Sequence, residues 1–160
     1  MKTRNIILVS ACLLGLNTKY NGKNNFSKDV INLKDEFVIL PVCPEQLGGL
    51  PTPRNPAEIV NGAGEDVISG RASVKTIDGE NVTDYYLKGA FETLKLVNLF
   101  GVKYGVFKEG SPSCGVRTIY DGTFSHTSIT GSGVTVALLK SHGVEIFNEN
   151  ETELLLRKIH

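Results

Sequence analysis

Short apolar runs recur along the chain and predict the strands of a buried sheet. Four of them are rich in valine, isoleucine, leucine and phenylalanine: residues 5–10, 36–41, 103–108 and 143–147. Continuous apolar runs of this length are typical of parallel strands that are covered on both faces. Helical patterns alternate with them, so we expect right-handed crossovers that place helices on both faces of the sheet.

The clearest helical pattern covers residues 83–101. Four of its apolar residues fall on one helical face: Leu87, Phe91, Leu94 and Val97. Thr83 is a suitable N-cap and Gly101 a suitable C-terminal stop, whereas Gly89 weakens a helix by about 1 kcal/mol relative to alanine. The pattern therefore predicts one long amphipathic helix.

Capping signals predict three shorter helices. Ser27 can cap a short helix before the second strand, and Ser132 can cap a helix that runs to Gly143. The last segment, 148–160, has acidic residues in its first turn and basic residues in its last turn, as the helix dipole favours. With the long helix, these segments supply the covering layers of the sheet.

Residues 44–82 interrupt the alternation of strands and helices. The segment holds four prolines and many glycines, and Asp78-Gly79 is a good turn signal. We predict an irregular excursion with short strands here. The patterns together indicate an α/β fold, a Rossmann-like three-layer sandwich with a mostly parallel sheet and an irregular Gly/Pro-rich excursion, in a single domain of residues 1–160.

Composition and charge argue against a nucleic-acid polymer as ligand and indicate the cellular compartment of the protein. Seventeen basic residues balance seventeen acidic ones, and no basic block is present that would track a nucleic-acid polymer. No apolar segment is long enough to span a membrane. The N-terminal apolar run resembles a secretory signal but holds Ser10 and Cys12, and it fits a first strand better. The lack of a convincing secretory signal and the odd number of cysteines favour a cytoplasmic protein without disulfides. We expect the chain to be a monomer or a homodimer.

The three cysteines of the chain, Cys12, Cys43 and Cys114, each follow a predicted strand. In a parallel sheet all strand carboxyl ends lie on one edge, where ligands bind. We therefore expect the three thiols to meet at that edge. The loops around them, CPEQLGG and GSPSCG, hold a carboxylate, hydroxyls and glycines that suit a binding site.

Three thiolates form a soft ligand set that suits zinc or an iron–sulfur cluster. Three protein ligands leave one coordination position open for a substrate, whereas His126 as a fourth ligand would close the site. Cysteine is also a small apolar residue that is often simply buried. Spacing alone leaves three alternatives: an open metal site, a closed metal site and three inert thiols.

Several long motifs resemble those of one family. They are VSACLLG at 9–15, YNG at 20–22, PVCPEQLGGLPTPRNPAEI at 41–59, SPSCG at 111–115 followed by IYDGTF, and GSGVTVALL at 131–139. Together they cover nearly the entire chain and resemble the family called domain of unknown function 523. They are similar also to the thiouracil desulfidases described within or beside that family.

The resemblance implies a 4Fe-4S cluster held by Cys12, Cys43 and Cys114, with one iron left without a protein ligand. Aerobic preparation can remove a cluster of this kind. The resemblance also implies the reaction. This is a non-redox desulfuration, in which a C=S bond of a small thiolated heterocycle such as thiouracil is hydrolysed and sulfide is released. The alternative is a non-catalytic module that binds a cluster, zinc or persulfide for sulfur storage, transfer or sensing.

Within this reading, three residues are candidates for the catalytic steps. Glu45, two residues from a cysteine, would position or deprotonate the attacking water, and Ser111 and Ser113 would hydrogen-bond the ring or its sulfur. The alternative for Glu45 is a structural role, in which its carboxylate caps its loop or forms an ion pair there. The alternative for the two serines is a role in a turn.

Three more residues near the motifs remain outside the predicted site. We expect Arg54 to pair with Glu58 at the surface. Asp121 is expected to form the Asp-Gly turn of IYDGTF. Tyr20 either stacks on a base or packs on the sheet, and the sequence leaves both possibilities open.

Overall fold

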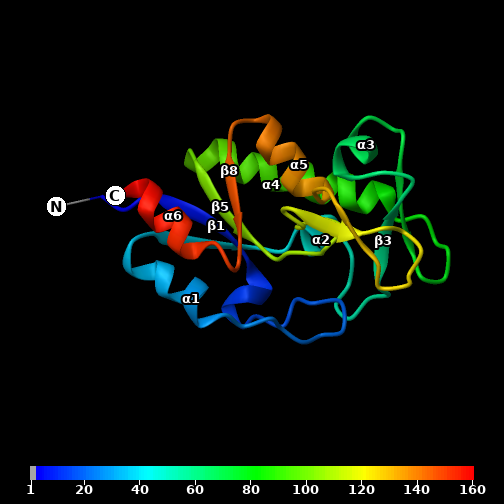
Figure 1. The fold of residues 1–160 in the computed structure, drawn as a ribbon, viewed down its shortest axis with the longest axis horizontal. Helices are drawn as coiled ribbons and strands as arrows, with labels where there is room; N and C mark the ends of the chain where they lie inside the picture. Colours follow the sequence, from blue (N-terminus) through cyan, green and yellow to red (C-terminus); the bar gives the residue numbers. More distant parts are fainter. Residues whose placement is uncertain (1–2) are drawn as a thin grey trace.

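A computed structural model of the protein describes residues 3–160, and its centre is a parallel sheet in the strand order β2-β1-β5-β8 (Figure 1). The bounds of these strands are β1 Ile6–Ser10, β2 Val38–Val42, β5 Tyr104–Phe107 and β8 Glu145–Asn148. β1 lies between β2 and β5, and β5 also pairs with β8. All three pairings are parallel. The four predicted apolar runs are confirmed as the four strands, with small shifts at their ends.

Helices cover both faces of the sheet, as Figure 1 shows. The helices of one face are α4 Thr83–Phe100 and α5 Val134–Ser141, and those of the other are α1 Lys28–Ile31, the 3-10 helix η2 Asn32–Asp35 and α6 Thr152–Ile159. Side chains alternate accordingly along β1. Leu8 packs into the core on the side of α4 and α5, whereas Ile7 and Val9 pack into the core on the side of α1, η2 and α6. The Rossmann-like three-layer prediction is confirmed.

The Gly/Pro-rich excursion holds the short strands that the sequence predicts and, in addition, two short helices that it does not. They are α2 Pro44–Leu47, β3 Ala57–Val60, α3 Gly64–Ile68 and β4 Ser73–Thr76. β3 and β4 pair antiparallel, and the Asp78-Gly79 turn follows β4 with a bond from the Gly79 N–H to the Thr76 carbonyl at 2.9 Å. A second antiparallel pair, β6 Thr118–Tyr120 with β7 Ser128–Thr130, was not predicted.

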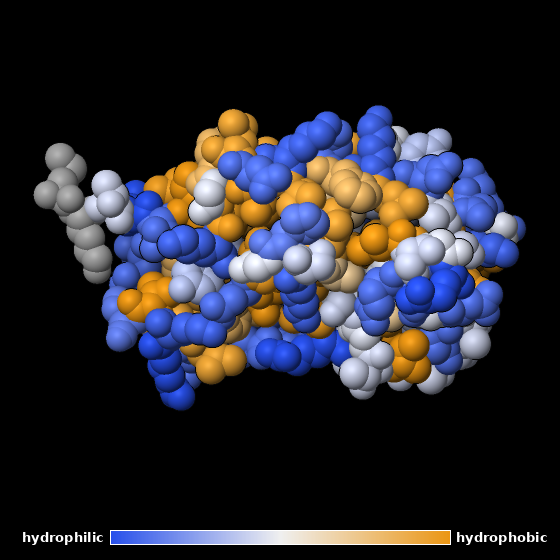
Figure 2. All heavy atoms as spheres, turned by 90° about the horizontal axis from the view of Figure 1, so that it is seen from above, coloured by the Kyte–Doolittle hydropathy of each residue, from blue (hydrophilic) through white to orange (hydrophobic). Residues whose placement is uncertain are grey.

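Helix α4 confirms the predicted segment and most of the predicted face: Leu94 and Val97 are buried, and Leu87 is partly buried against the same core. Its buried residues are Tyr86, Gly89, Ala90, Thr93, Leu94 and Val97. Phe91, expected on the buried face, is 47% exposed, and apolar side chains do reach the surface of the molecule seen from above (Figure 2). Phe91 is exposed because α4 packs against both α2 and α5, and the buried side of the helix is the side that faces these two neighbours.

The ends of three helices test the capping predictions. Ser27 accepts the Val30 N–H at 3.3 Å, as predicted, and Gly101 ends α4 with φ of 64°. Val82, and not Thr83, is the N-cap of α4, because the Thr83 hydroxyl accepts the Val74 N–H at 2.9 Å. Ser132 likewise leaves the N-cap of α5 to Gly133.

The Ser132 hydroxyl donates to the Val116 carbonyl at 3.0 Å, which explains why this side chain does not cap α5.

Helix α6 has Glu153 in its first turn and Arg157 and Lys158 in its last, as predicted. Within residues 3–160, no helix combines the length and the apolar character needed to cross a membrane.

Candidate functional site

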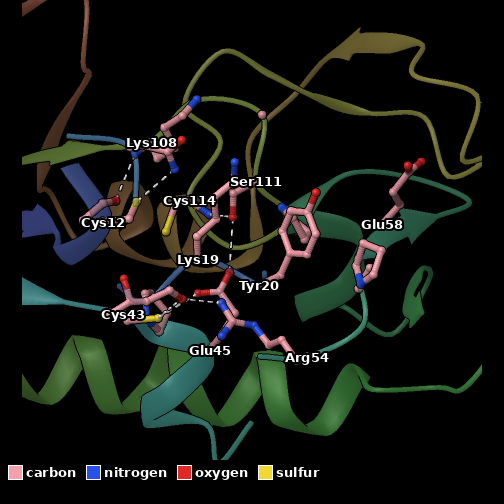
Figure 3. Close-up of a pocket in the computed structure, with 18 of the residues that line it drawn as sticks. Cys12, Lys19, Tyr20, Cys43, Glu45, Arg54, Glu58, Lys108, Ser111 and Cys114 are labelled. Carbon is pink, nitrogen blue, oxygen red and sulfur yellow. Dashed lines mark hydrogen bonds between the residues drawn. The ribbon is translucent and has the colours of Figure 1, made fainter. Parts of the chain in front are cut away.

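The three thiols line one cavity at the carboxyl edge of the sheet (Figure 3). Cys12 lies in the 3-10 helix η1 Ala11–Leu14, directly after β1, and Cys43 is the N-cap of α2, directly after β2. Cys114 lies in the loop that follows β5. The cavity has a volume of about 420 Å³. The structure thus brings together the cysteines that the sequence places at three strand ends.

Close approach of α2 and α4 sets the position of Cys43 and Glu45. A Cβ atom at Gly89 would overlap the Pro44 carbonyl oxygen, and one at Gly48 would overlap the Tyr85 carbonyl oxygen. Glycine at both positions therefore lets the two helices touch backbone to backbone. The predicted helix-weakening role of Gly89 is secondary to this contact, which seats α2 at the rim of the cavity.

Glu45 connects the second and third cysteine loops. Its carboxylate is 7% exposed and accepts hydrogen bonds from the Ser113 hydroxyl and, at 3.3 Å, from the Ser111 hydroxyl. The Cys43 thiol donates to its second oxygen at 3.5 Å. The predicted trio of Glu45, Ser111 and Ser113 is therefore one hydrogen-bonded group, and the Ser113 hydroxyl lies 3.3 Å from the Cys114 sulfur.

The loop that carries Cys114 is held by a residue that the sequence analysis missed. Glu109 accepts three backbone N–H groups with one oxygen, from Val116 at 2.7 Å, Arg117 at 2.8 Å and Thr118 at 3.0 Å. Its other oxygen accepts the Asn148 side-chain amide at 2.8 Å. The signal available in the sequence was an acid at the start of a glycine-rich loop, a position that suits a carboxylate acceptor for loop N–H groups.

The hydrogen bonds to Glu109 change its acidity. Burial by itself would raise the pKa of Glu109, but the N–H groups of Thr118, Arg117 and Val116 and the Asn148 amide outweigh it and lower the pKa. The carboxylate is therefore charged in the folded protein at neutral pH. Its charge strengthens each of the hydrogen bonds that hold the loop.

The thiols themselves are weak acids in this cavity. Burial, followed by the nearby Glu45 charge, raises the pKa of Cys43 to about 11 and raises that of Cys114 as well. Burial also raises the pKa of Cys12, against a hydrogen bond from the Asn25 side chain at 3.5 Å. The three thiols therefore hold their protons at neutral pH, and a soft metal that bound them would release those protons.

The other end of the cavity is aromatic and more open. Its lining includes Tyr20, Ile77, Tyr120, Phe124 and His126. Tyr20 and Ile77 are 42% and 56% exposed. In Figure 3, Tyr20 lies between the three cysteines and Glu58. Tyr20 therefore lines the cavity, and its stacking on a base stays a prediction.

The predicted Arg54–Glu58 ion pair is wrong. Arg54 lines the cavity and donates to the Thr18 carbonyl at 3.0 Å and the Thr52 hydroxyl at 3.0 Å. Glu58 instead accepts backbone N–H groups of the loop after β6.

The predicted turn role of Asp121 is confirmed, because its carboxylate accepts the Thr123 N–H at 3.0 Å.

His126 also lines the cavity, but from the loop between β6 and β7, where its ring packs edge-on to Tyr120 with centroids 6.4 Å apart. Among the residues that the structure describes, no three His, Cys, Asp or Glu side chains are arranged to hold a single metal ion. The three thiols line one cavity of about 420 Å³.

Fold and site define a class: an α/β protein whose cavity at the carboxyl edge of a parallel sheet combines three thiols with a buried carboxylate. The sequence model of 2-thiouracil desulfurase matches residues 7–151. The chain belongs to this family of desulfidase enzymes.

Two similar proteins cover most of the chain. A 4Fe-4S-dependent thiouracil desulfidase of known structure, TudS, is 40% identical, covers 98% of both chains and superposes with a TM-score of 0.84. An uncharacterized protein of Bacillus subtilis (strain 168), YbbK, is 48% identical over 151 residues, which are 94% of this chain and all of the relative.

Proposed function

We propose that this enzyme removes sulfur from a small thiolated heterocycle such as thiouracil, with a 4Fe-4S cluster held by Cys12, Cys43 and Cys114. One observation carries the proposal: three soft thiol donors and a buried carboxylate line the same cavity. The donor set fits the cluster, because thiolates are its usual protein ligands and the cavity has room beside them. The 4Fe-4S dependence of the similar TudS supports the same choice.

When bound, the cluster would supply an iron without a protein ligand, a soft Lewis acid able to take up sulfur. The remaining chemistry falls to the side chains of the cavity. Glu45 lies between the Cys43 loop and the Cys114 loop, and its carboxylate is oriented by two serine hydroxyls. We assign it the role of general base toward the attacking water.

The reaction balances without electron transfer. The water oxygen attacks the thiocarbonyl carbon while Glu45 accepts a proton, and the sulfur departs as sulfide, so that thiocarbonyl plus water gives carbonyl plus hydrogen sulfide. Ser111 and Ser113 hold the carboxylate oxygen that faces them, because both hydroxyls donate to the same atom. The burial of Ser113 and Glu45 limits their movement.

The test is a measurement of iron, acid-labile sulfide and turnover after anaerobic reconstitution. We expect about four irons per chain in the wild type and sulfide release from 4-thiouracil. Separate Cys12→Ser, Cys43→Ser and Cys114→Ser variants are expected to lose the cluster and all turnover. A full cluster without turnover of thiouracil or related thio-bases would favour a sulfur carrier, and failure to bind iron would reject the proposal.

A further inference from the structure

The aromatic end of the cavity depends on a loop that contributes two side chains to its lining. This loop, residues 121–127, joins β6 to β7 and brings Phe124 and His126 to the cavity. Phe124 is half-buried there, whereas most of the loop is exposed. The loop faces the same cavity as the three thiols, so its conformation determines the shape of the space beside them.

One buried carboxylate of β3 holds this loop. Glu58 is 9% exposed, and one of its oxygens accepts the N–H groups of Gly122 at 3.0 Å and Phe124 at 3.2 Å. The loop also packs closely on β3, because a Cβ atom at Gly122 would lie 2.6 Å from the Ile59 carbonyl oxygen. The carboxylate therefore anchors the loop at Gly122, where it comes closest to the strand, and again two residues further on at Phe124.

The loop needs an anchor because its backbone is unfavourable. Phe124 and His126 have φ of 57° and 60°, in the left-handed region that residues with a Cβ rarely adopt. Such a conformation persists only when the surroundings fix it. Since Glu58 binds the N–H of Phe124 itself, the most direct constraint on that residue comes from this carboxylate.

We propose that Glu58 is a positioning residue, which holds the 121–127 loop so that Phe124 forms an aromatic wall for the heterocyclic ring of the substrate. The inference rests on the proposed function for the identity of the ligand. Rings bind well to aromatic faces because each offers a flat, weakly hydrated surface. Glu58 acts on binding through Phe124 and does not touch the reacting atoms.

The experiment compares Glu58→Ala, Glu58→Gln and Phe124→Ala in the reconstituted enzyme with 4-thiouracil as substrate. We expect Glu58→Ala and Phe124→Ala each to raise KM about tenfold, the effect of losing one base–aromatic contact, with kcat within about twofold. Iron content is expected to stay at the wild-type value. Glu58→Gln, whose amide oxygen still accepts both N–H groups, is expected to retain most of the affinity.

Two further measurements separate positioning from a general structural effect. The double variant Glu58→Ala/Phe124→Ala is expected to resemble either single variant, because both changes remove the same wall. Amide hydrogen exchange at Gly122 and Phe124 is expected to accelerate about tenfold or more in Glu58→Ala, without change at the core strands. Glu65→Ala, an exposed glutamate on α3, is the control and is expected to change neither quantity.

The outcomes distinguish this inference from the proposed function. Unchanged exchange at Gly122 and Phe124 in Glu58→Ala would overturn the anchoring role. Faster exchange with an unchanged KM, or fully additive KM effects in the double variant, would overturn the aromatic wall. If the wild type released no sulfide from 4-thiouracil, the proposed function would fail, and equilibrium binding of uracil to the same variants would then decide whether the wall holds a ring.

Discussion

Two consecutive loops build opposite ends of the cavity, and a glutamate holds each through backbone N–H groups. Residues 109–118 are held by Glu109, which accepts three N–H groups and an asparagine amide. Residues 121–127 are held by Glu58, which accepts two N–H groups with one oxygen. The first loop buries Ser113 and Cys114, whereas the second is mostly exposed.

The difference between the loops matches a difference in task. The loop of Cys114 is tied at many points and packed on the start of α5, where the Thr135 N–H donates to the Ser113 carbonyl at 3.0 Å. Tight positioning of this kind suits the catalytic role that we propose for Ser113. A surface that receives a ring tolerates more movement. We infer that the 109–118 loop governs chemistry and cluster retention, and the 121–127 loop governs binding.

The largest effect should come from the carboxylate at the buried end. Glu45→Gln removes the proposed general base but keeps a side chain of the same shape, so turnover of 4-thiouracil is expected to fall by about 10²- to 10⁴-fold. Iron content and KM should stay near the wild-type values. Steady-state kinetics on reconstituted protein check this, and loss of iron in the same variant would instead assign Glu45 a structural role.

A smaller but global effect is expected from Glu109→Ala. The change leaves three backbone N–H groups of the 109–118 loop without their charged acceptor, which should destabilise the folded protein by about 1–3 kcal/mol. Urea denaturation at pH 7 measures this, with Glu153→Ala as a matched control, because the Glu153 side chain is 87% exposed. Cluster retention should also decline in Glu109→Ala, whereas equal stabilities of the two variants would contradict the anchoring role.

The contribution of Glu109 should depend on pH with a defined sign. Its folded-state pKa is lowered, so its contribution to stability is complete above the ordinary glutamate value of about 4.3 and is lost as pH falls through the lower folded-state value. The stability difference between wild type and Glu109→Ala should therefore be constant near neutral pH and shrink in acid. A difference that grew in acid would reverse the sign of the shift.

The smallest effect concerns the contact that seats Cys43 and Glu45. Gly89→Ala improves helix propensity by about 1 kcal/mol, but its Cβ would overlap the Pro44 carbonyl oxygen, and overpacking costs about 1–3 kcal/mol. We expect a net loss of stability and a lower kcat, because α2 must shift. Lys88→Ala, at the exposed neighbouring position, is the control; a stabilised Gly89→Ala protein would show that α2 adapts without strain.

The strands and the meeting of the cysteines could be predicted because they follow from local pattern and one topological rule. An apolar run such as residues 5–10 fits a strand covered on both faces, and parallel strands place whatever follows them at one edge. Once Cys12, Cys43 and Cys114 were seen to follow strands, their common cavity needed no further information. The resemblance of their motifs to a family added the cofactor and the reaction.

Contacts between distant segments could not be predicted in the same way. Phe91 and Gly89 both fit the helical pattern, yet only their neighbours in space decided that the phenylalanine is exposed and the glycine is packed against α2. Arg54 and Glu58 form a plausible ion pair by spacing, but each binds backbone groups that lie far from it in the sequence.

Periodicity and strand direction can be followed along the sequence, so the sheet, its covering helices and the common edge of the three thiols were predictable. The carboxylate that holds each loop became known only from the packed chain: Glu109 holds the loop of Cys114, and Glu58 holds the loop of Phe124. The physical reason is that a carboxylate can accept any N–H group that folding brings within about 3 Å. Which group arrives there is set by how the whole chain packs.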